Sequence, residues 1–140
     1  PASTRVSTRR RHGQLRRGDF LQQLTQALQV NEPGWTALLS VRLDQAESLG
    51  RTLGQAAAYA LEQEVAERLG AELDPDDSYT IWLEFGFGML ARRPSREALV
   101  SLADALCRAV SRRPFELQGE ALSLTASIGM ALPPGHGGAD

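Results

Sequence analysis

The stretch from Tyr79 to Arg92, YTIWLEFGFGMLAR, decides how this sequence folds. Two apolar, β-prone runs meet at the short centre LEFG, which is the pattern of a β-hairpin. The centre lacks the Asn-Gly or Gly-Gly pair that favours a tight two-residue turn. Instead, Leu83, Glu84 and Phe85 stand at the expected tip, with an aromatic residue where a polar one is usual. The sequence predicts a hairpin and raises the question of why these residues form its tip.

Helical and extended patterns alternate on both sides of this hairpin. Apolar residues recur every three or four positions in some segments, and short apolar runs fill the others. Pro and Gly at 33–34 and the run DPDDS at 74–78 separate elements. The predicted elements are helices at about 16–30, 45–50, 52–73 and from Ser95 onward, and strands at 35–44, within 79–92 and within 113–132. This order predicts an α+β sandwich, a mostly antiparallel central sheet with helices packed on it in a ferredoxin-like arrangement.

Length and composition favour one soluble domain. The chain has 140 residues, of which 42% are hydrophobic, and this is ordinary for a protein with a single core. No apolar run approaches the roughly 20 residues that span a bilayer, and the polar N-terminus shows no signal peptide. The single cysteine, Cys107, and the two histidines, His12 and His136, argue against a disulfide framework, a zinc site and a His-based triad. We therefore expect a cytoplasmic protein with no direct membrane contact.

The net charge of −2 hides a basic beginning and an acidic remainder. Six arginines precede the first acid, Asp19, whereas the rest of the chain holds nine arginines against seventeen acids, a net charge of −8. The basic head could contact phosphates, act as a transit peptide or serve as a solvated linker. It has no interleaved aromatic residues and no amphipathic period, which favours a flexible Arg-rich linker over 1–14. The acidic remainder, predicted to form one domain over 15–132 before a disordered tail at 133–140, argues against nucleic acid as a partner.

Three segments share a pattern with a known family. They read RRGDFLQQL at 16–24, LLSVRLDQAESLGRTLGQAAAYALEQEVAERL at 38–69 and RRPFELQGEALSLTASIGMAL at 112–132. In this order they resemble the GGDEF-type diguanylate cyclases over roughly residues 12–132, with no large gap. The resemblance implies the nucleotidyl cyclase-type GGDEF fold, which agrees with the ferredoxin-like arrangement predicted above.

The hairpin tip corresponds to the motif that gives this family its name. Active members join two GTP molecules into cyclic di-GMP with two divalent cations, which need carboxylate oxygens, and paired glycines let the backbone approach the nucleotide. In this chain Leu83 and Glu84 stand where the resemblance expects the two glycines. Phe85 and Gly86 stand where it expects the carboxylates. Only Phe87, which has a core-packing role in the family, matches the motif.

The other positions that the resemblance assigns to the site differ in the same way. Arg42 replaces the metal-binding Asp, and Asp44 is retained two residues later. Gly50 and Tyr59 replace an Asn and an Asp that bind the base. We expect Arg42 to pair with Asp44 or another acid, although its guanidinium could instead contact a phosphate. A slip of one or two residues in the hairpin would make Glu84 a displaced metal ligand.

Many family members carry an inhibitory product site, R-x-x-D, ahead of the hairpin motif. The corresponding window here is DPDD, with Asp74 in the Arg position and Asp77 retained. Without the arginine, and with extra acids nearby, a doubly anionic dinucleotide should be repelled. The sequence therefore predicts that this site is also lost.

Together with the resemblance, these differences predict a catalytically inactive domain with a regulatory or interaction role and no metal or other cofactor. Its expected partners are neighbouring sensory or EAL (phosphodiesterase-type) domains of the same polypeptide, or a second copy in a homodimer. Exposure of Trp82 and Phe85 beside the cleft would indicate a protein contact. Two alternatives stay open, a metal-independent GTP-binding sensor and a residual cyclase with rearranged ligands.

Overall fold

The computed structural model describes residues 13–29 and 33–132, so most of the Arg-rich head and the tail lie outside the described residues. The described residues form helices around a four-stranded sheet, together with a separate two-stranded sheet. The elements are α2 (Arg17–Gln29), β1 (Trp35–Leu43), α3 (Ala46–Thr52), α4 (Gln55–Gly70), β2 (Ser78–Leu83), β3 (Gly86–Arg93), α5 (Arg96–Ser111), β4 (Phe115–Leu117), β5 (Glu120–Leu122) and β6 (Ala126–Ala131). The predicted α+β class is confirmed, and so is the order of elements as far as α5; the segment 113–132, predicted to form two strands, forms three.

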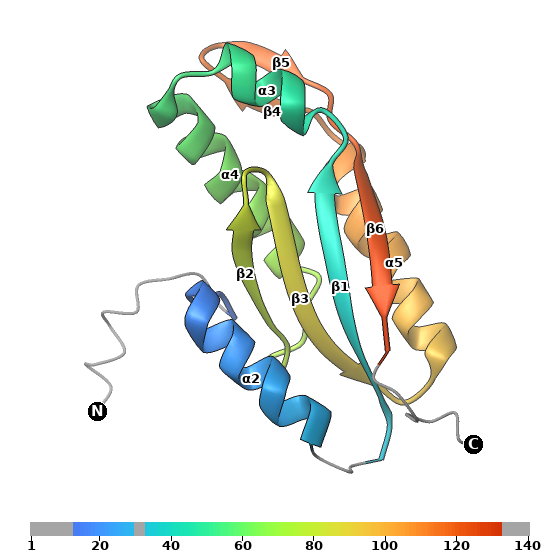
Figure 1. Ribbon diagram of the computed structural model, residues 1–140. Coiled ribbons are helices and arrows are strands. Elements are labelled where there is room, and N and C mark those ends of the chain that lie inside the picture. The colour runs from blue at the N-terminus through green and yellow to red at the C-terminus, as the bar shows by residue number, and fades with distance from the viewer. Residues whose placement is uncertain (1–12, 30–32, 133–140) are drawn as a thin grey trace.

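The central sheet has the strand order β2-β3-β1-β6, and each neighbouring pair is antiparallel. Helices α4 and α5 lie on one face of this sheet, and α2 crosses part of the other face beside β2 and β3 (Figure 1). The small β4–β5 hairpin lies at the same end of the molecule as α3 (Figure 1). Within the part of the chain that the structure describes, no helix has the length and apolar character needed to cross a membrane.

Alternation along β1 decides which face of the sheet meets the helices. Four residues at every second position are almost completely buried: Ala37, Leu39, Val41 and Leu43. Burial of each Leu or Val side chain contributes roughly 1.5–3 kcal/mol. Ser40 and Arg42, between them, are exposed on the opposite face. This alternation confirms the strand predicted at 35–44 and gives it one buried and one exposed face.

Apolar stripes on two helices complete this core. In α4 the stripe repeats every four residues, and in α5 every three or four. Its members are Leu61, Val65 and Leu69 in α4, and Leu99, Leu102, Leu106 and Ala109 in α5. Ser95 caps α5, because its Oγ accepts a hydrogen bond from the N–H of Ala98 at 3.1 Å. The start predicted for this helix at Ser95 is confirmed.

The bounds predicted for one helix are wrong. The helix expected over 52–73 begins at Gln55 and ends at Gly70, because Leu53 and Gly54 have extended backbone between α3 and α4. Residues 13–14, expected in a flexible linker, lie beside β2. The N–H of Tyr79 donates to the carbonyl of Gly13 at 2.8 Å, and a parallel bridge joins residues 14 and 79. This bridge covers part of the outer edge of β2.

Candidate functional site

The β2–β3 hairpin turns over two residues, Glu84 and Phe85. β2 ends at Leu83, β3 begins at Gly86, and these two residues are paired. Of the two turn residues, only Phe85 has a positive φ, 56°. Left-handed backbone costs on the order of 1–3 kcal/mol for a residue other than glycine. Other contacts must therefore hold Phe85 in this conformation.

Both the side chain and the backbone of Phe85 supply such contacts. Its ring is fully buried in the core, which contributes roughly 1.5–3 kcal/mol. Its N–H donates to Oε2 of Glu62 on α4 at 2.8 Å, and its carbonyl accepts the N–H of Leu43 at 3.1 Å. An aromatic residue stands at this tip because the tip turns inward and anchors the hairpin to the core.

Trp82, just before the tip, lies at an irregular step of the sheet. The β2–β3 register shifts there by one residue, as in a β-bulge. Its indole covers Gly88, where an added Cβ would come within 2.7 Å of three ring atoms. Trp82 is half-buried and Phe85 is buried. These two aromatics therefore do not form the exposed pair that would have indicated a protein contact.

The end of β1 carries Arg42 and Asp44 on the exposed face of the sheet. Arg42 lies opposite Gly86, and within the described residues its side chain makes no hydrogen bond or ion pair. Asp44 accepts hydrogen bonds from Ser127 Oγ at 2.5 Å and Thr125 Oγ1 at 2.6 Å. Both bonds lower the pKa of Asp44, and the bond from Ser127 lowers it more. The expected Arg42–Asp44 ion pair is wrong, because the two hydroxyls beside β1 engage the carboxylate instead.

Glu84 reaches from the tip to α3. An ideal Cβ on Gly50 would lie 2.9 Å from Oε1 of Glu84. The carboxylate of Glu84 thus fills the space that a side chain at position 50 would need. Tyr59 on α4 is 66% exposed. The structure brings Gly50 into contact with the hairpin tip and leaves Tyr59 on the surface.

The acids of the DPDD window lie at the other end of the hairpin, in the turn before β2. Asp77 is buried and accepts hydrogen bonds from the two terminal nitrogens of Arg93 at 2.9 and 2.7 Å. It also accepts the N–H of Asp74 at 2.8 Å, and the Asp74 carboxylate lies 3.5 Å from Arg93. The hydrogen bonds to Asp77 raise the pKa of Arg93. The expectation of a repelling acidic window missed Arg93, the last residue of β3, which forms an ion pair with Asp77.

The sequence matches one protein family along most of its length. A model of the family described as "Diguanylate cyclase, GGDEF domain" matches residues 15–139. The chain is a GGDEF domain. A protein of Thiocystis violacea, described as an uncharacterized 76.5 kDa protein in the phbC 3′ region, is 29% identical over 126 residues. The match covers 87% of this chain but 18% of that protein, so the GGDEF domain spans less than a fifth of the length of this relative.

Solved structures of other GGDEF domains have the same fold. The GGDEF domain of YfiN (TpbB) from Pseudomonas aeruginosa is 27% identical, with a TM-score of 0.78 over 87% of this chain and 78% of that one. The FimX GGDEF domain from the same organism is 22% identical, with a TM-score of 0.77 over 87% and 76%. The P. aeruginosa diguanylate cyclase SiaD, solved with its activator SiaC, is 21% identical, with a TM-score of 0.78 over 94% and 52%. At these lower identities the likeness to FimX and SiaD concerns the fold.

The residues of this GGDEF domain do not fit a pair of divalent cations. Mg²⁺ needs carboxylate or other oxygen ligands. The positions that the family resemblance assigns to ligands hold Arg42, Phe85 and Gly86, and the Asp44 carboxylate is engaged by two hydroxyls. Within 13–29 and 33–132, no group of three or more His, Cys, Asp or Glu residues is arranged to hold a metal ion.

Proposed function

We propose that this GGDEF domain does not synthesise cyclic di-GMP and acts as a regulatory or interaction module in a cyclic di-GMP signalling protein. The observation that carries the proposal is the inward-facing Phe85, at a hairpin position where active family members are expected to hold a metal-binding carboxylate. Its ring is buried and its backbone is bonded to Glu62 and Leu43. A residue held in this way supplies no metal ligand.

The charge at the end of β1 supports the same conclusion. Arg42 has a permanent positive charge at the position expected for a metal-binding Asp. Like unit charges 4 Å apart near a protein surface repel by about 4 kcal/mol, and a doubly charged cation is repelled more. Asp44, just after this strand, forms no ion pair with Arg42, and its carboxylate accepts hydrogen bonds from Ser127 and Thr125 instead.

The space beside α3 also disfavours a nucleotide. The Glu84 carboxylate lies against Gly50, the position that the resemblance assigns to a base-binding residue. A bound guanine would have to displace this side chain, and a triphosphate would be brought close to its negative charge. Steric overlap and charge repulsion therefore both oppose nucleotide binding.

We infer that the domain exerts its role through protein contacts in the cytoplasm, with no nucleic acid and no direct membrane contact. The T. violacea relative extends far beyond the matched region, and SiaD has been solved with a protein activator. By analogy, the partners of this domain are neighbouring sensory or EAL domains of one polypeptide, or a second copy in a homodimer.

Incubation of the purified chain with GTP and Mg²⁺ tests the proposal. We expect no cyclic di-GMP by chromatography under conditions in which an active GGDEF domain, assayed in parallel, turns over its substrate. Cyclic di-GMP that increases with protein concentration and disappears in the E84A variant would contradict the proposal. That result would support the residual cyclase, with Glu84 as its displaced ligand.

A second candidate, the metal-independent GTP sensor, is favoured by one observation. The exposed Arg42 guanidinium makes no hydrogen bond or ion pair within the described residues, and guanidinium groups bind phosphates. Calorimetric titration with GTP in EDTA separates the candidates, and we expect no binding heat at millimolar GTP. Heat that R42A removes and R51A leaves intact would establish the sensor instead, because Arg51 is an exposed arginine that pairs with Glu47 on α3.

A further inference from the structure

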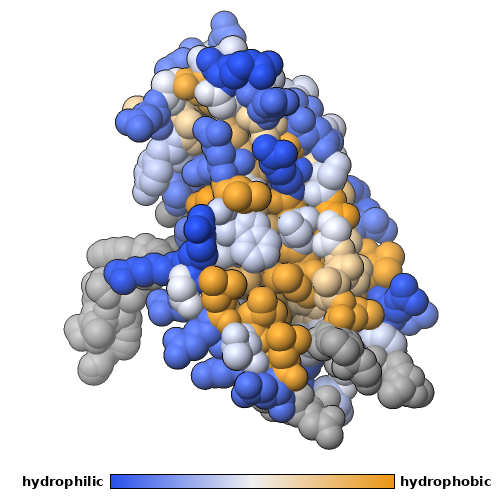
Figure 2. Space-filling view, in the orientation of Figure 1, coloured by the Kyte–Doolittle hydropathy of each residue, from blue (hydrophilic) through white to orange (hydrophobic). Residues whose placement is uncertain are grey.

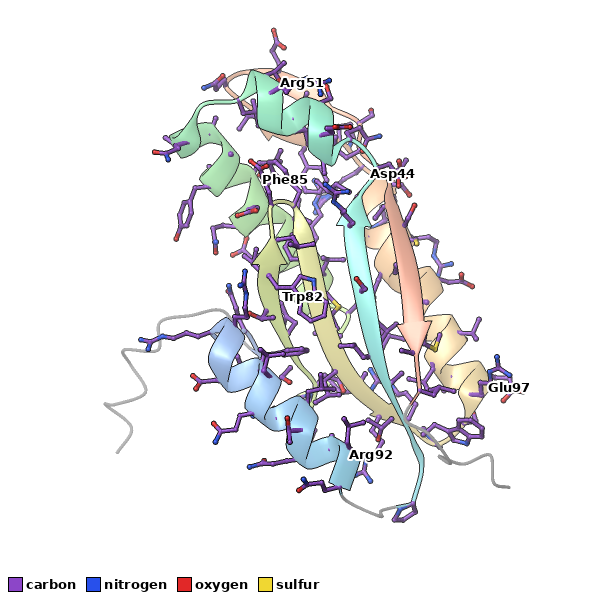
Figure 3. The ribbon with its side chains drawn as sticks, in the orientation of Figure 1. Asp44, Arg51, Trp82, Phe85, Arg92 and Glu97 are labelled. Atoms are coloured by element: carbon purple, nitrogen blue, oxygen red, sulfur yellow. The ribbon has the colours of Figure 1, made fainter. Side chains whose placement is uncertain are left out.

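The hairpin tip is a meeting point of elements that are distant in the sequence. Trp82 contacts α2, Glu84 lies against α3, and Phe85 is bonded to α4 and β1. Figure 3 shows Trp82 on the α2 side of the sheet and Phe85 at the tip, toward α4. Three nearly consecutive residues thus connect α2, on one face of the sheet, with α4, on the other face, and with α3.

The α2 side of this meeting point is held by a charged and an aromatic contact. Nη2 of Arg17 donates to the carbonyl of Trp82 at 2.6 Å. The Phe20 ring meets the indole edge-on, with centroids 5.7 Å apart and an interplanar angle of 88°. Phe20 is the buried residue of α2, so the first turn of α2 is fastened to Trp82.

Trp82 lies where the regular pairing of β2 with β3 is interrupted. Regular β2–β3 pairing runs from Ser78–Leu90 to Ile81–Phe87, and then the register shifts before Leu83. A bulge disrupts the ladder locally and leaves its extra residue unpaired. Trp82 can therefore be displaced without breaking the regular pairs below it.

On the other side of the bulge, the turn is held by groups from three elements. Glu62 of α4 accepts the N–H of Phe85, and Leu43 at the end of β1 donates to its carbonyl. The Glu84 carboxylate rests on Gly50 of α3. A shift of the Glu84–Phe85 turn must change these contacts, because the left-handed backbone at Phe85 leaves the turn few alternative conformations.

We propose that the hairpin tip is a mechanical link that couples the position of α2 to α3 and α4. A displacement of the first turn of α2 pulls on Trp82, moves the turn and alters the bond between Phe85 and Glu62. The link does not rest on the proposed function, because it requires no nucleotide. Since a coupling free energy is reciprocal, loosening the turn from the α4 side must also loosen α2.

Hydrogen exchange of the full chain, read at single amides by NMR, tests the forward direction. R17A removes the bond to the Trp82 carbonyl, and we expect exchange of the Phe85 amide to quicken about tenfold, the factor for one lost hydrogen bond. R16A is the matched control, because Arg16 is an exposed neighbour of Arg17 in the sequence. The Val41 amide, deep in the sheet, should exchange as in wild type in both variants.

The reverse direction uses Glu62. E62A removes the acceptor of the Phe85 N–H, and we expect the Phe20 amide of α2, which is bonded to the carbonyl of Arg16, to exchange several-fold faster. E62Q keeps an acceptor oxygen and should restore slow exchange at Phe20. If E62A quickened exchange of the Phe85 amide and left exchange of the Phe20 amide unchanged, α2 and α4 would not be coupled and the link would not exist.

A result in which R17A loosens α2 and leaves the Phe85 amide at the wild-type rate would equally overturn the proposal. Should R17A unfold the chain, F20L serves in its place, because it keeps an apolar side chain in the core but removes the edge-on ring contact with Trp82. The same increase at Phe85, with Val41 unchanged, is then expected. No GTP is present in any of these measurements, so their outcome does not depend on whether the domain binds nucleotide.

Discussion

The two ends of the β2–β3 hairpin stand where the family resemblance expects two ligand sites, and the contacts that hold the residues there differ in kind. At the tip, Phe85 turns into the core and its polar backbone atoms are bonded to α4 and β1. At the other end, Asp77 is buried and held by two hydrogen bonds from Arg93. The first set of contacts depends on apolar burial and the second on a buried charge pair.

Because of this difference, the two ends should respond differently to salt, to pH and to the loss of a side chain. Apolar burial depends weakly on salt and pH, and its loss leaves a cavity. A buried ion pair contributes little net stability, but loss of one partner leaves a buried charge without compensation. On the face that Figure 2 shows, apolar residues gather over the sheet, and hydrophilic residues gather at the end of the molecule that holds α3.

The largest expected effect is at the tip. F85A should destabilise the domain by about 3–5 kcal/mol, because it removes a fully buried ring. Urea unfolding followed by tryptophan fluorescence measures this change. L83A is the matched control, since Leu83 is 60% exposed, and its effect should stay within about 0.5 kcal/mol. Equal effects of the two variants would mean that Phe85 is not an anchor.

At the other end, R93A should cost about 3 kcal/mol, the lower end of the range for breaking a buried pair, because Asp77 keeps its charge. The double variant D77N/R93A should be more stable than R93A alone, since it removes the uncompensated charge. R96A, at an exposed arginine on the first turn of α5, provides the control. The comparison with Phe85 would fail if R93A and D77N/R93A had the same unfolding free energy.

A smaller effect is expected where the tip meets α3. Replacing glycine by alanine inside a helix stabilises by roughly 0.5–1 kcal/mol, but at Gly50 the added Cβ must push Glu84 aside. We expect G50A to stabilise the E84A variant by that amount and the wild type by less. A double-mutant cycle of chemical unfolding measures the difference. An interaction free energy of zero in this cycle would show that moving the Glu84 side chain away from Gly50 costs no stability.

The smallest effect concerns Asp44. S127A should raise the pKa of Asp44 toward its ordinary value of 3.8, and T125A should raise it less, because the Ser127 bond is the larger cause of the lowering. The folded pKa lies below the unfolded one, so this contribution to stability is present above about pH 4 and is lost as pH falls through the folded value. NMR titration of the carboxyl carbon gives each pKa. An unchanged pKa in S127A would contradict the role of this hydroxyl.

The sequence by itself determined the elements and the family. Alternation placed Leu39 and Val41 on the buried face of β1, Ser95 marked the start of α5, and two apolar runs predicted the hairpin. These features depend on neighbouring residues with a period of two or about 3.6, so they can be read from the chain. For the site, the sequence could show only which residue stands at each position.

Only the tertiary structure decided what those residues touch. The bond from Arg17 to Trp82 joins residues 65 apart, and that from Glu62 to Phe85 joins residues 23 apart. The choice of Ser127 rather than Arg42 as a partner for Asp44, and of Arg93 for Asp77, likewise depends on strand register and packing. Such contacts are not encoded in any local period: a side chain pairs with whichever group the assembled sheet and helices bring within hydrogen-bonding distance.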